Sequence, residues 1–206
     1  MDVIELDLFY DYNCPFVYRA AKTLEAVGDS GERALKINWR YFSLSQVNHR
    51  AEDADLAWTV WSAPASETVK GRLAFMAAEA ARRQDRFDAF HIALLDARHR
   101  DRLDIEDQAV VERVAMAAGL DLERLRSDLA DPTILDRLER DHSEARDILG
   151  VFGTPTLVFG GGAAYVRLAR VLEGTEALRV FETVAGTVAG EPDVLEIKRP
   201  IRPVAV

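Results

Sequence analysis

The position of the alternating segments is the feature that most constrains the fold of this chain, because such segments occur only near its two ends. Residues 3–10 alternate between an apolar and a mixed face, and residues 35–42 alternate again. Between them, residues 14–27 place apolar side chains at helical spacing. A strand, a helix and a second strand in this order predict a βαβ unit whose two strands are parallel.

The middle of the chain, from residue 52 to residue 149, shows helical periodicity and little alternation. The apolar stripes predict about five consecutive helices. We expect these helices near residues 66–84, 87–98, 104–119, 121–129 and 132–149. Asp104 and Asp121 are placed to cap the third and the fourth. A helical block of this length between alternating segments indicates an insertion.

Strand signals return after Gly150. We expect a short strand at Thr156–Phe159, a turn at Gly160–Gly162, a partner strand at 165–172 and a final helix at 175–188. The fold class predicted by this order is an α/β domain interrupted by an all-helical insertion. The expected division is a discontinuous α/β domain (1–49 and 148–190), an insertion (50–147) and an extended, proline-containing tail (191–206).

Charge and cysteine content exclude several classes of function. The chain has 26 Lys and Arg against 35 Asp and Glu, a net charge of −9, so we expect neither nucleic acid nor an anionic membrane as a partner. No apolar run is long enough to span a membrane, and the first residues do not resemble a signal peptide, so we expect a cytoplasmic protein. A single cysteine excludes an intramolecular disulfide, and four scattered histidines do not favour a metal site.

Cys14 is the candidate for chemistry. It follows the first predicted strand and stands at the start of the first predicted helix, with Pro15 immediately behind it. The free N–H groups and the positive dipole end of a helix favour a thiolate over a thiol. The alternative is a small buried apolar side chain. The junction between strand and helix favours the reactive thiol.

A second signal lies 140 residues further along the chain, where Gly153-Thr154-Pro155-Thr156 precedes a short apolar strand. Proline at the start of a strand removes a donor from the hydrogen-bond ladder and is compatible with a cis peptide bond. Alone, such a proline is an ordinary trans turn. Its meaning depends on whether it meets Cys14 in the fold.

The two signals together resemble one family. Residues 9–18 (Phe-Tyr-Asp-Tyr-Asn-Cys-Pro-Phe-Val-Tyr), residues 150–156 (Gly-Val-Phe-Gly-Thr-Pro-Thr) and the helical block between them, with Phe90-His91-Ile92-Ala93-Leu94-Leu95, carry the resemblance. They are similar to thioredoxin-fold proteins of the DsbA-like group, which includes the kappa-class glutathione transferases and the 2-hydroxychromene-2-carboxylate isomerases. The resemblance covers the chain up to about residue 190. It implies a thioredoxin-like fold with an all-helical insertion domain.

The resemblance also implies roles for single positions. Cys14 would be the attacking thiol, and Thr154 and Pro155 would form a cis-proline loop beside its sulfur. The backbone of Thr154 would be free to pair with an extended peptide or with glutathione. The substrate-binding residues expected on this basis are Pro15, Phe16, Thr154 and Tyr12, with Cys14 and Pro155 as the catalytic pair.

Position 17 departs from the family pattern, because a dithiol oxidoreductase carries a second cysteine where this chain has Val17. We therefore expect a monothiol oxidoreductase whose mixed disulfide at Cys14 is resolved by an external thiol. The resemblance implies no tightly bound cofactor and no metal, with glutathione or another low-molecular-weight thiol as co-substrate. The expected partners are a small thiol or disulfide and an extended peptide, and the tail would allow a homodimer.

Two alternatives stay open. The glutathione-using branch commonly has Ser-Pro where this chain has Cys14-Pro15, so a glutathione-dependent transferase or isomerase is the rival enzyme. A non-catalytic binding protein on the same fold is the third reading.

Other polar residues are expected to have structural roles. His142 lies on an apolar stripe that leads toward the Gly-Thr-Pro loop, so it is either a core histidine or a group that tunes Cys14. We expect His91 in the core and His49 and His99 on the surface. Glu5 and Asp7, together with the arginines at 82, 83 and 86, are expected to face solvent.

Overall fold

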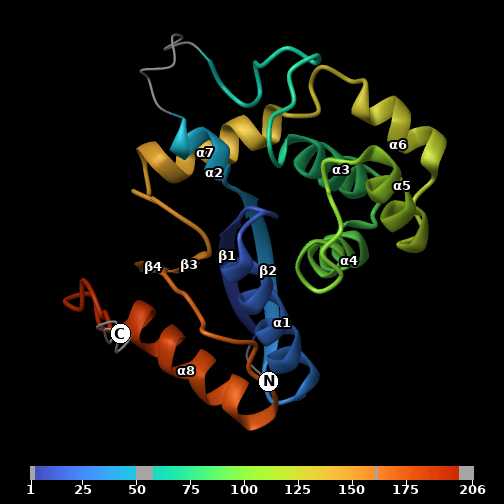
Figure 1. The fold of residues 1–206 in the computed structure, drawn as a ribbon. Helices are drawn as coiled ribbons and strands as arrows, with labels where there is room; N and C mark the ends of the chain where they lie inside the picture. The colour runs from blue at the N-terminus through green and yellow to red at the C-terminus, as the bar shows by residue number, and fades with distance from the viewer. Residues whose placement is uncertain (1–2, 50–57, 161, 200–206) are drawn as a thin grey trace, which may run out of the picture.

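A computed structural model describes residues 3–49, 58–160 and 162–199 of the chain. Its centre is a four-stranded mixed sheet in the order β2-β1-β3-β4. Strand β1 (Val3–Tyr10) pairs in parallel with β2 (Ala34–Tyr41) and antiparallel with β3 (Thr156–Phe159). The predicted βαβ opening is therefore confirmed. In Figure 1 the helical block lies above and to the right of the sheet.

The expected position of the last strand is wrong. Strand β4 is Gly162–Tyr165, antiparallel to β3, and not a segment that begins at Tyr165. Since β3 has only four residues, pairing ends where Tyr165 meets Thr156. The apolar residues that follow leave the sheet and pack against the first helix, where Leu172 donates its N–H to Thr23 Oγ1 at 3.0 Å.

Helices cover both faces of β1. Helices α1 (Pro15–Asp29) and α8 (Gly174–Gly190) pack against each other, and α8 lies below the sheet in Figure 1. Leu6, Leu8 and Tyr10 belong to the main core, which includes buried side chains of α1 and α8. On the opposite face, Phe9 joins a small second core with Phe42, Ala145 and Val151. Ala145 comes from α7 (Asp136–Asp147), so this helix covers the second face.

The block between β2 and β3 begins with the short helix α2 (Leu44–Asn48). It continues with α3 (Arg72–Arg83), α4 (Phe87–His99), α5 (Gln108–Ala117), α6 (Leu122–Leu129) and α7. The five longer helices match the expected number within the described residues. The start of the expected insertion, residues 50–57, lies outside the described residues. No helix of the described chain is long and apolar enough to cross a membrane.

Two details of the helical block differ from expectation. Asp107, not Asp104, caps α5 by accepting the Ala109 N–H at 2.8 Å. Helix α7 starts at Asp136 because residues 132–135 form turns.

The tail after α8 has no regular structure over residues 191–199. Val194, Leu195 and Ile197 are exposed there, and Leu195 is 94% exposed. The expectation for residues 200–206 lies outside the described residues, as does that for Gly161. Gly160 is in a turn, whereas Gly162 already belongs to β4.

Candidate active site around Cys14

Cys14 stands at the junction between sheet and helix. Strand β1 ends at Tyr10, and a turn closes when the Cys14 N–H donates to the Asp11 carbonyl at 3.0 Å. Cys14 is then the N-cap residue of α1, with extended backbone angles, and Pro15 occupies the first helical position, where no N–H is needed. The sulfur therefore lies at the N-terminal end of a helix, which is the positive end of its dipole.

The Gly-Thr-Pro loop meets Cys14. The Cys14 thiol donates to the carbonyl oxygen of Thr154 at 3.2 Å, across 140 residues of sequence. The sheet produces this contact, because β3 pairs with β1 at Phe9↔Thr156 and so brings the residues before β3 to the end of β1. The Thr154–Pro155 peptide bond is cis. The two sequence signals thus form one site.

Two of the expected substrate-binding residues are buried. Tyr12 is fully buried, and its hydroxyl pairs with Nδ1 of His91 at 3.0 Å within an aromatic cluster, so its side chain does not face a substrate. Burial raises the pKa of the Tyr12 hydroxyl. Thr154 is also buried, and its carbonyl accepts the Cys14 thiol, so its backbone lies beside the sulfur. The sequence alone could not show that Tyr12 and Thr154 are buried, because both residues stand next to the predicted site in the chain.

The rim of the site begins at Phe16, which is half-buried at the start of α1, and two arginines flank its ring. The guanidinium carbon of Arg19 lies 5.2 Å from the ring centre and that of Arg167 lies 5.0 Å away. Pro15 is exposed beside it. Beyond Arg167, the ring of Tyr165 packs edge to face with Phe152, which is 67% exposed. The rim therefore combines apolar rings with positive charge.

Asp11 is a site residue that the sequence reasoning missed. Its carboxylate is buried and accepts two backbone N–H groups at 2.8 Å, one from Asn13 and one from Leu44. Burial raises the pKa of Asp11 to about 6, against these two hydrogen bonds, which lower it. A signal for it existed, because aspartate in a turn commonly binds the N–H two residues further on.

Hydrogen bonds to the backbone hold both His99 and His142 in place. His99 is half-buried, contrary to expectation: its Nε2 bonds the Tyr12 carbonyl at 2.8 Å, and its ring stacks on Tyr18. Burial lowers the pKa of His99. His142 accepts the Ser43 N–H at 3.1 Å and packs on Phe42, and within the described contacts it does not touch Cys14. Burial lowers the pKa of His142 to about 4.

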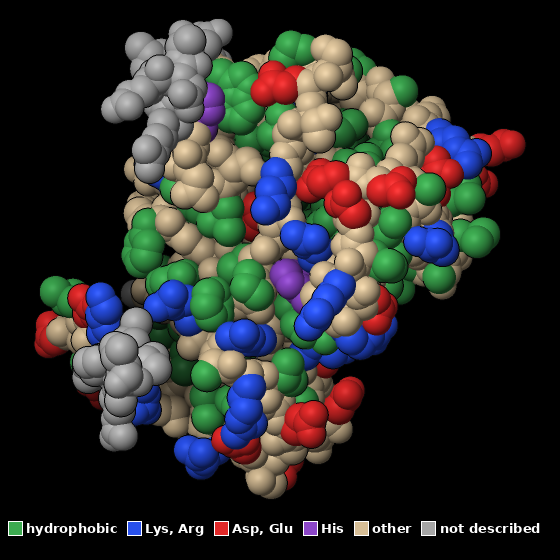
Figure 2. Space-filling view, viewed as in Figure 1, with side chains coloured by type: hydrophobic (Ala, Val, Ile, Leu, Met, Phe, Trp, Pro, Cys, Tyr) green, Lys and Arg blue, Asp and Glu red, His purple; other side chains and the backbone are tan. Residues whose placement is uncertain are grey.

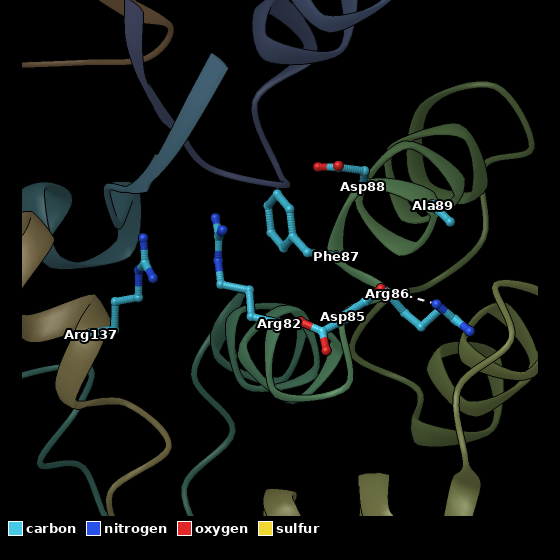
Figure 3. A pocket seen from close by; sticks show the side chains of 7 residues that line it. All are labelled: Arg82, Asp85, Arg86, Phe87, Asp88, Ala89 and Arg137. Atoms are coloured by element: carbon cyan, nitrogen blue, oxygen red, sulfur yellow. Dashed lines mark hydrogen bonds between the residues drawn. The ribbon is translucent and has the colours of Figure 1, made fainter. Parts of the chain in front are cut away.

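A hollow lies elsewhere, among α3, α4 and α7 (Figure 3). It has a volume of about 620 Å³ and is lined mainly by charged side chains, including Arg82, Arg86 and Arg137. Contrary to expectation, Arg82 does not lie on a solvated face. Its guanidinium carbon lies 3.4 Å from the centre of the Phe87 ring, and it donates to the Trp39 carbonyl at 2.7 Å. None of the lining residues contacts Cys14 in the described contacts.

Of the two carboxylates that were expected to face solvent, only one is exposed. Glu5 is exposed and pairs with Lys36, whereas Asp7 is half-buried and accepts from Arg40 at 3.2 Å. Among the described residues, no group of three or more His, Cys, Asp and Glu side chains is arranged to hold a metal ion.

Comparisons with known proteins agree with this geometry. The family described as DSBA-like thioredoxin domain matches residues 5–184. An uncharacterized protein of Mycobacterium tuberculosis is 29% identical over 98% of this chain and 84% of its own length. The crystal structure of a probable DsbA oxidoreductase from Streptomyces coelicolor is 20% identical, with a TM-score of 0.63 over 98% of this chain and 94% of that chain.

A 2-hydroxychromene-2-carboxylate isomerase structure gives a similar superposition. It is 16% identical, with a TM-score of 0.62 over 89% of this chain and 95% of that chain. At these identities the two structures show the fold, which is the thioredoxin-like fold with added helices that the sequence predicts.

Proposed function

This chain belongs to the DSBA-like thioredoxin domain family, and on that premise we propose that it is a thiol–disulfide oxidoreductase that works through one cysteine. The Cys14 thiol first loses its proton to solvent. The thiolate then attacks one sulfur of a disulfide, forming a mixed disulfide and releasing the other half as a thiolate. A second, external thiolate attacks the mixed disulfide, restoring the Cys14 thiolate and leaving with the bound half as a new disulfide.

The observation that carries this proposal is the contact between Cys14 at the start of α1 and the Thr154 carbonyl. The start of α1 and the Gly-Thr-Pro loop thus meet at the sulfur, and the loop places a backbone edge beside it. Val17, one turn along α1, is fully buried and apolar. The chain has no second cysteine, so resolution requires a thiol from outside. A cytoplasmic location would supply such a thiol.

The direct test is to incubate the protein with oxidised glutathione and to measure its mass. We expect one glutathione joined through a disulfide, none on Cys14→Ser, and release at a rate that rises with the concentration of added thiol. Cys14→Ser keeps nearly the same size at a buried position, so its unfolding midpoint serves as the control for folding. A thiol-independent release would contradict external resolution.

A second variant tests the missing partner. Val17→Cys would place a thiol three residues after Cys14 on the same helix, and Val17 N–H already donates to the Cys14 carbonyl at 3.1 Å. Positions three apart on a helix are within the Cα separation of a disulfide. We expect the oxidised variant to be two hydrogens lighter and free of adduct. An adduct as stable as that of wild type would show that the two positions are not juxtaposed.

One observation favours a second candidate, a glutathione-dependent isomerase or transferase. The Cys14 thiol is 5% exposed and is held as a hydrogen-bond donor, a role that a serine hydroxyl could also fill. In that case the site would bind a reduced thiol without bonding to it. Oxidised glutathione would then leave little adduct, while Cys14→Ser would keep activity on an apolar electrophile. An inert Cys14 and no activity in either assay would instead indicate a binding protein.

A further inference from the structure

We propose that the rim of the site selects low-molecular-weight disulfides that carry carboxylate groups, and that Arg19 and Arg167 make this selection. The inference rests on the proposed function, because it concerns the disulfide that Cys14 attacks. It adds the charge of the substrate, which neither the family nor the mechanism fixes.

Phe16 organises the two arginines. Their guanidinium carbons lie 5.2 and 5.0 Å from the centre of its ring, within the distance at which a cation is attracted to an aromatic face. Arg19 comes from α1 and also donates to the Leu168 carbonyl at 3.0 Å. Arg167 comes from the segment after β4. Two charges from separate segments are therefore held at one ring.

Two segments of the chain connect the cluster of Phe16, Arg19 and Arg167 to the sulfur of Cys14. Phe16 lies two residues after Cys14. Next to Arg167, Val166 donates its N–H to the Pro155 carbonyl at 3.1 Å, and the neighbouring Thr154 carbonyl accepts the Cys14 thiol. A disulfide that presents a sulfur to Cys14 would thus bring its nearby groups to the two guanidinium groups.

The charge of this cluster is not compensated within the described part of the chain. Neither Arg19 nor Arg167 forms an ion pair with a described carboxylate, although the chain carries a net charge of −9 and many of its other arginines are paired. In Figure 2, basic side chains lie among hydrophobic ones across the middle of the face shown. Unpaired guanidinium groups beside a nucleophile attract anions, and their planar geometry suits carboxylates.

The experiment compares two disulfides of opposite charge at Cys14. Oxidised glutathione is a net anion, and cystamine is a dication. Each forms the mixed disulfide and releases its other half as a thiol, so formation can be followed by mass. The measured quantity is the rate for oxidised glutathione divided by the rate for cystamine, in wild type, Arg167→Gln, Arg167→Lys and Arg126→Gln. Intrinsic differences between the disulfides cancel when variants are compared.

We expect the ratio to fall about tenfold in Arg167→Gln, the lower end of what a focused charge adds to association rates. Arg167→Lys should keep most of the ratio, and so should Arg126→Gln, which removes the same charge from an exposed pair with Glu112 in the insertion. Added salt should lower the wild-type ratio more than that of Arg167→Gln. Arg167 is exposed, so its replacement should leave the unfolding midpoint unchanged.

Equal ratios in wild type and Arg167→Gln, with adducts forming in both, would overturn the selection by charge and leave the proposed function standing. An equal fall in Arg126→Gln would also overturn it, because net charge alone would then explain the effect. Failure of both disulfides to form an adduct with wild type would overturn the proposed function, and this inference with it.

Discussion

Asp11 shows how one buried group beside the site affects the whole protein. Its carboxylate ties the turn before Cys14 to the start of α2, through the Asn13 and Leu44 N–H groups. Burial nevertheless raises its pKa from 3.8 to about 6. The folded state therefore holds a proton that the unfolded state has already lost between these two values.

The raised pKa of Asp11 predicts how the stability of the protein changes with pH. The contribution of Asp11 is fully present below about pH 4 and is lost as the pH rises through about 6, a change of about 3 kcal/mol for a shift of this size. Urea unfolding of wild type and Asp11→Asn at pH 4 and pH 7.5 would measure it. We expect the wild type to lose more stability than the variant on going to pH 7.5. If the two proteins differed by the same free energy of unfolding at both pH values, the raised pKa of Asp11 would be contradicted.

Between about pH 4 and pH 6.5, His142 changes the stability of the protein in the direction opposite to Asp11. The comparison between the two pH values therefore needs the Asp11→Asn variant. The pKa of His142 is lowered to about 4, so the folded state stays neutral where the unfolded histidine is charged. Its contribution is lost as the pH falls from about 6.5 to about 4. The same loss occurs in wild type and in Asp11→Asn, and it cancels in the difference.

At the scale of elements, a buried ion pair joins β2 to α7. Arg40 on β2 donates through Nε to Asp141 at 2.8 Å, and Asp141 also accepts the Tyr41 N–H at 3.2 Å. Both side chains are nearly buried, at 11% and 5% exposure. Their pairing fixes the helix that covers the second face of the sheet, over Phe9 and Phe42.

We therefore expect Arg40→Ala to destabilise the fold by about 3 kcal/mol, because it leaves the buried carboxylate of Asp141 without its main partner. Lys36→Ala is the matched control on the same strand. Lys36 pairs with Glu5 in solvent, and its loss should cost less than about 1 kcal/mol. Denaturant unfolding gives both values. Equal losses would mean that the Arg40–Asp141 pair does not anchor α7.

At the scale of the whole molecule, the sheet and the helical insertion share one core. Leu8 of β1 and Val17 of α1 belong to the same buried cluster as Phe75, Leu94 and Leu125 of the insertion. His99 adds a polar connection, from α4 to the Tyr12 carbonyl beside Cys14. The division into an α/β domain and an insertion at residues 50–147 stays a prediction, but the contacts do not separate the two parts.

A shared core predicts one cooperative unfolding transition. Hydrogen exchange measured by mass spectrometry should give the same highest free energy of opening for peptides from β1 and from α4, equal to the global value from urea unfolding. A clearly lower value for α4 would show that the insertion unfolds by itself.

Local sequence determined the elements and singled out Cys14. Alternation and helical spacing predicted β1, α1, β2 and the five longer helices, because an amphipathic segment must bury its apolar side whatever surrounds it. The change of period at residues 11–14 placed Cys14 at a helix start. The motif pair then indicated the family that matches residues 5–184.

Tertiary structure decided what each side chain near the site does. Tyr12 and Phe16 look alike in sequence, yet one is buried against His91 and the other holds two arginines on the rim. Arg167 lies 153 positions from Cys14 and has no local pattern that marks it. Burial of Asp11 depends on α2 closing over it through Leu44. These roles come from contacts between distant segments, and periodicity reports only the environment that a segment makes for itself.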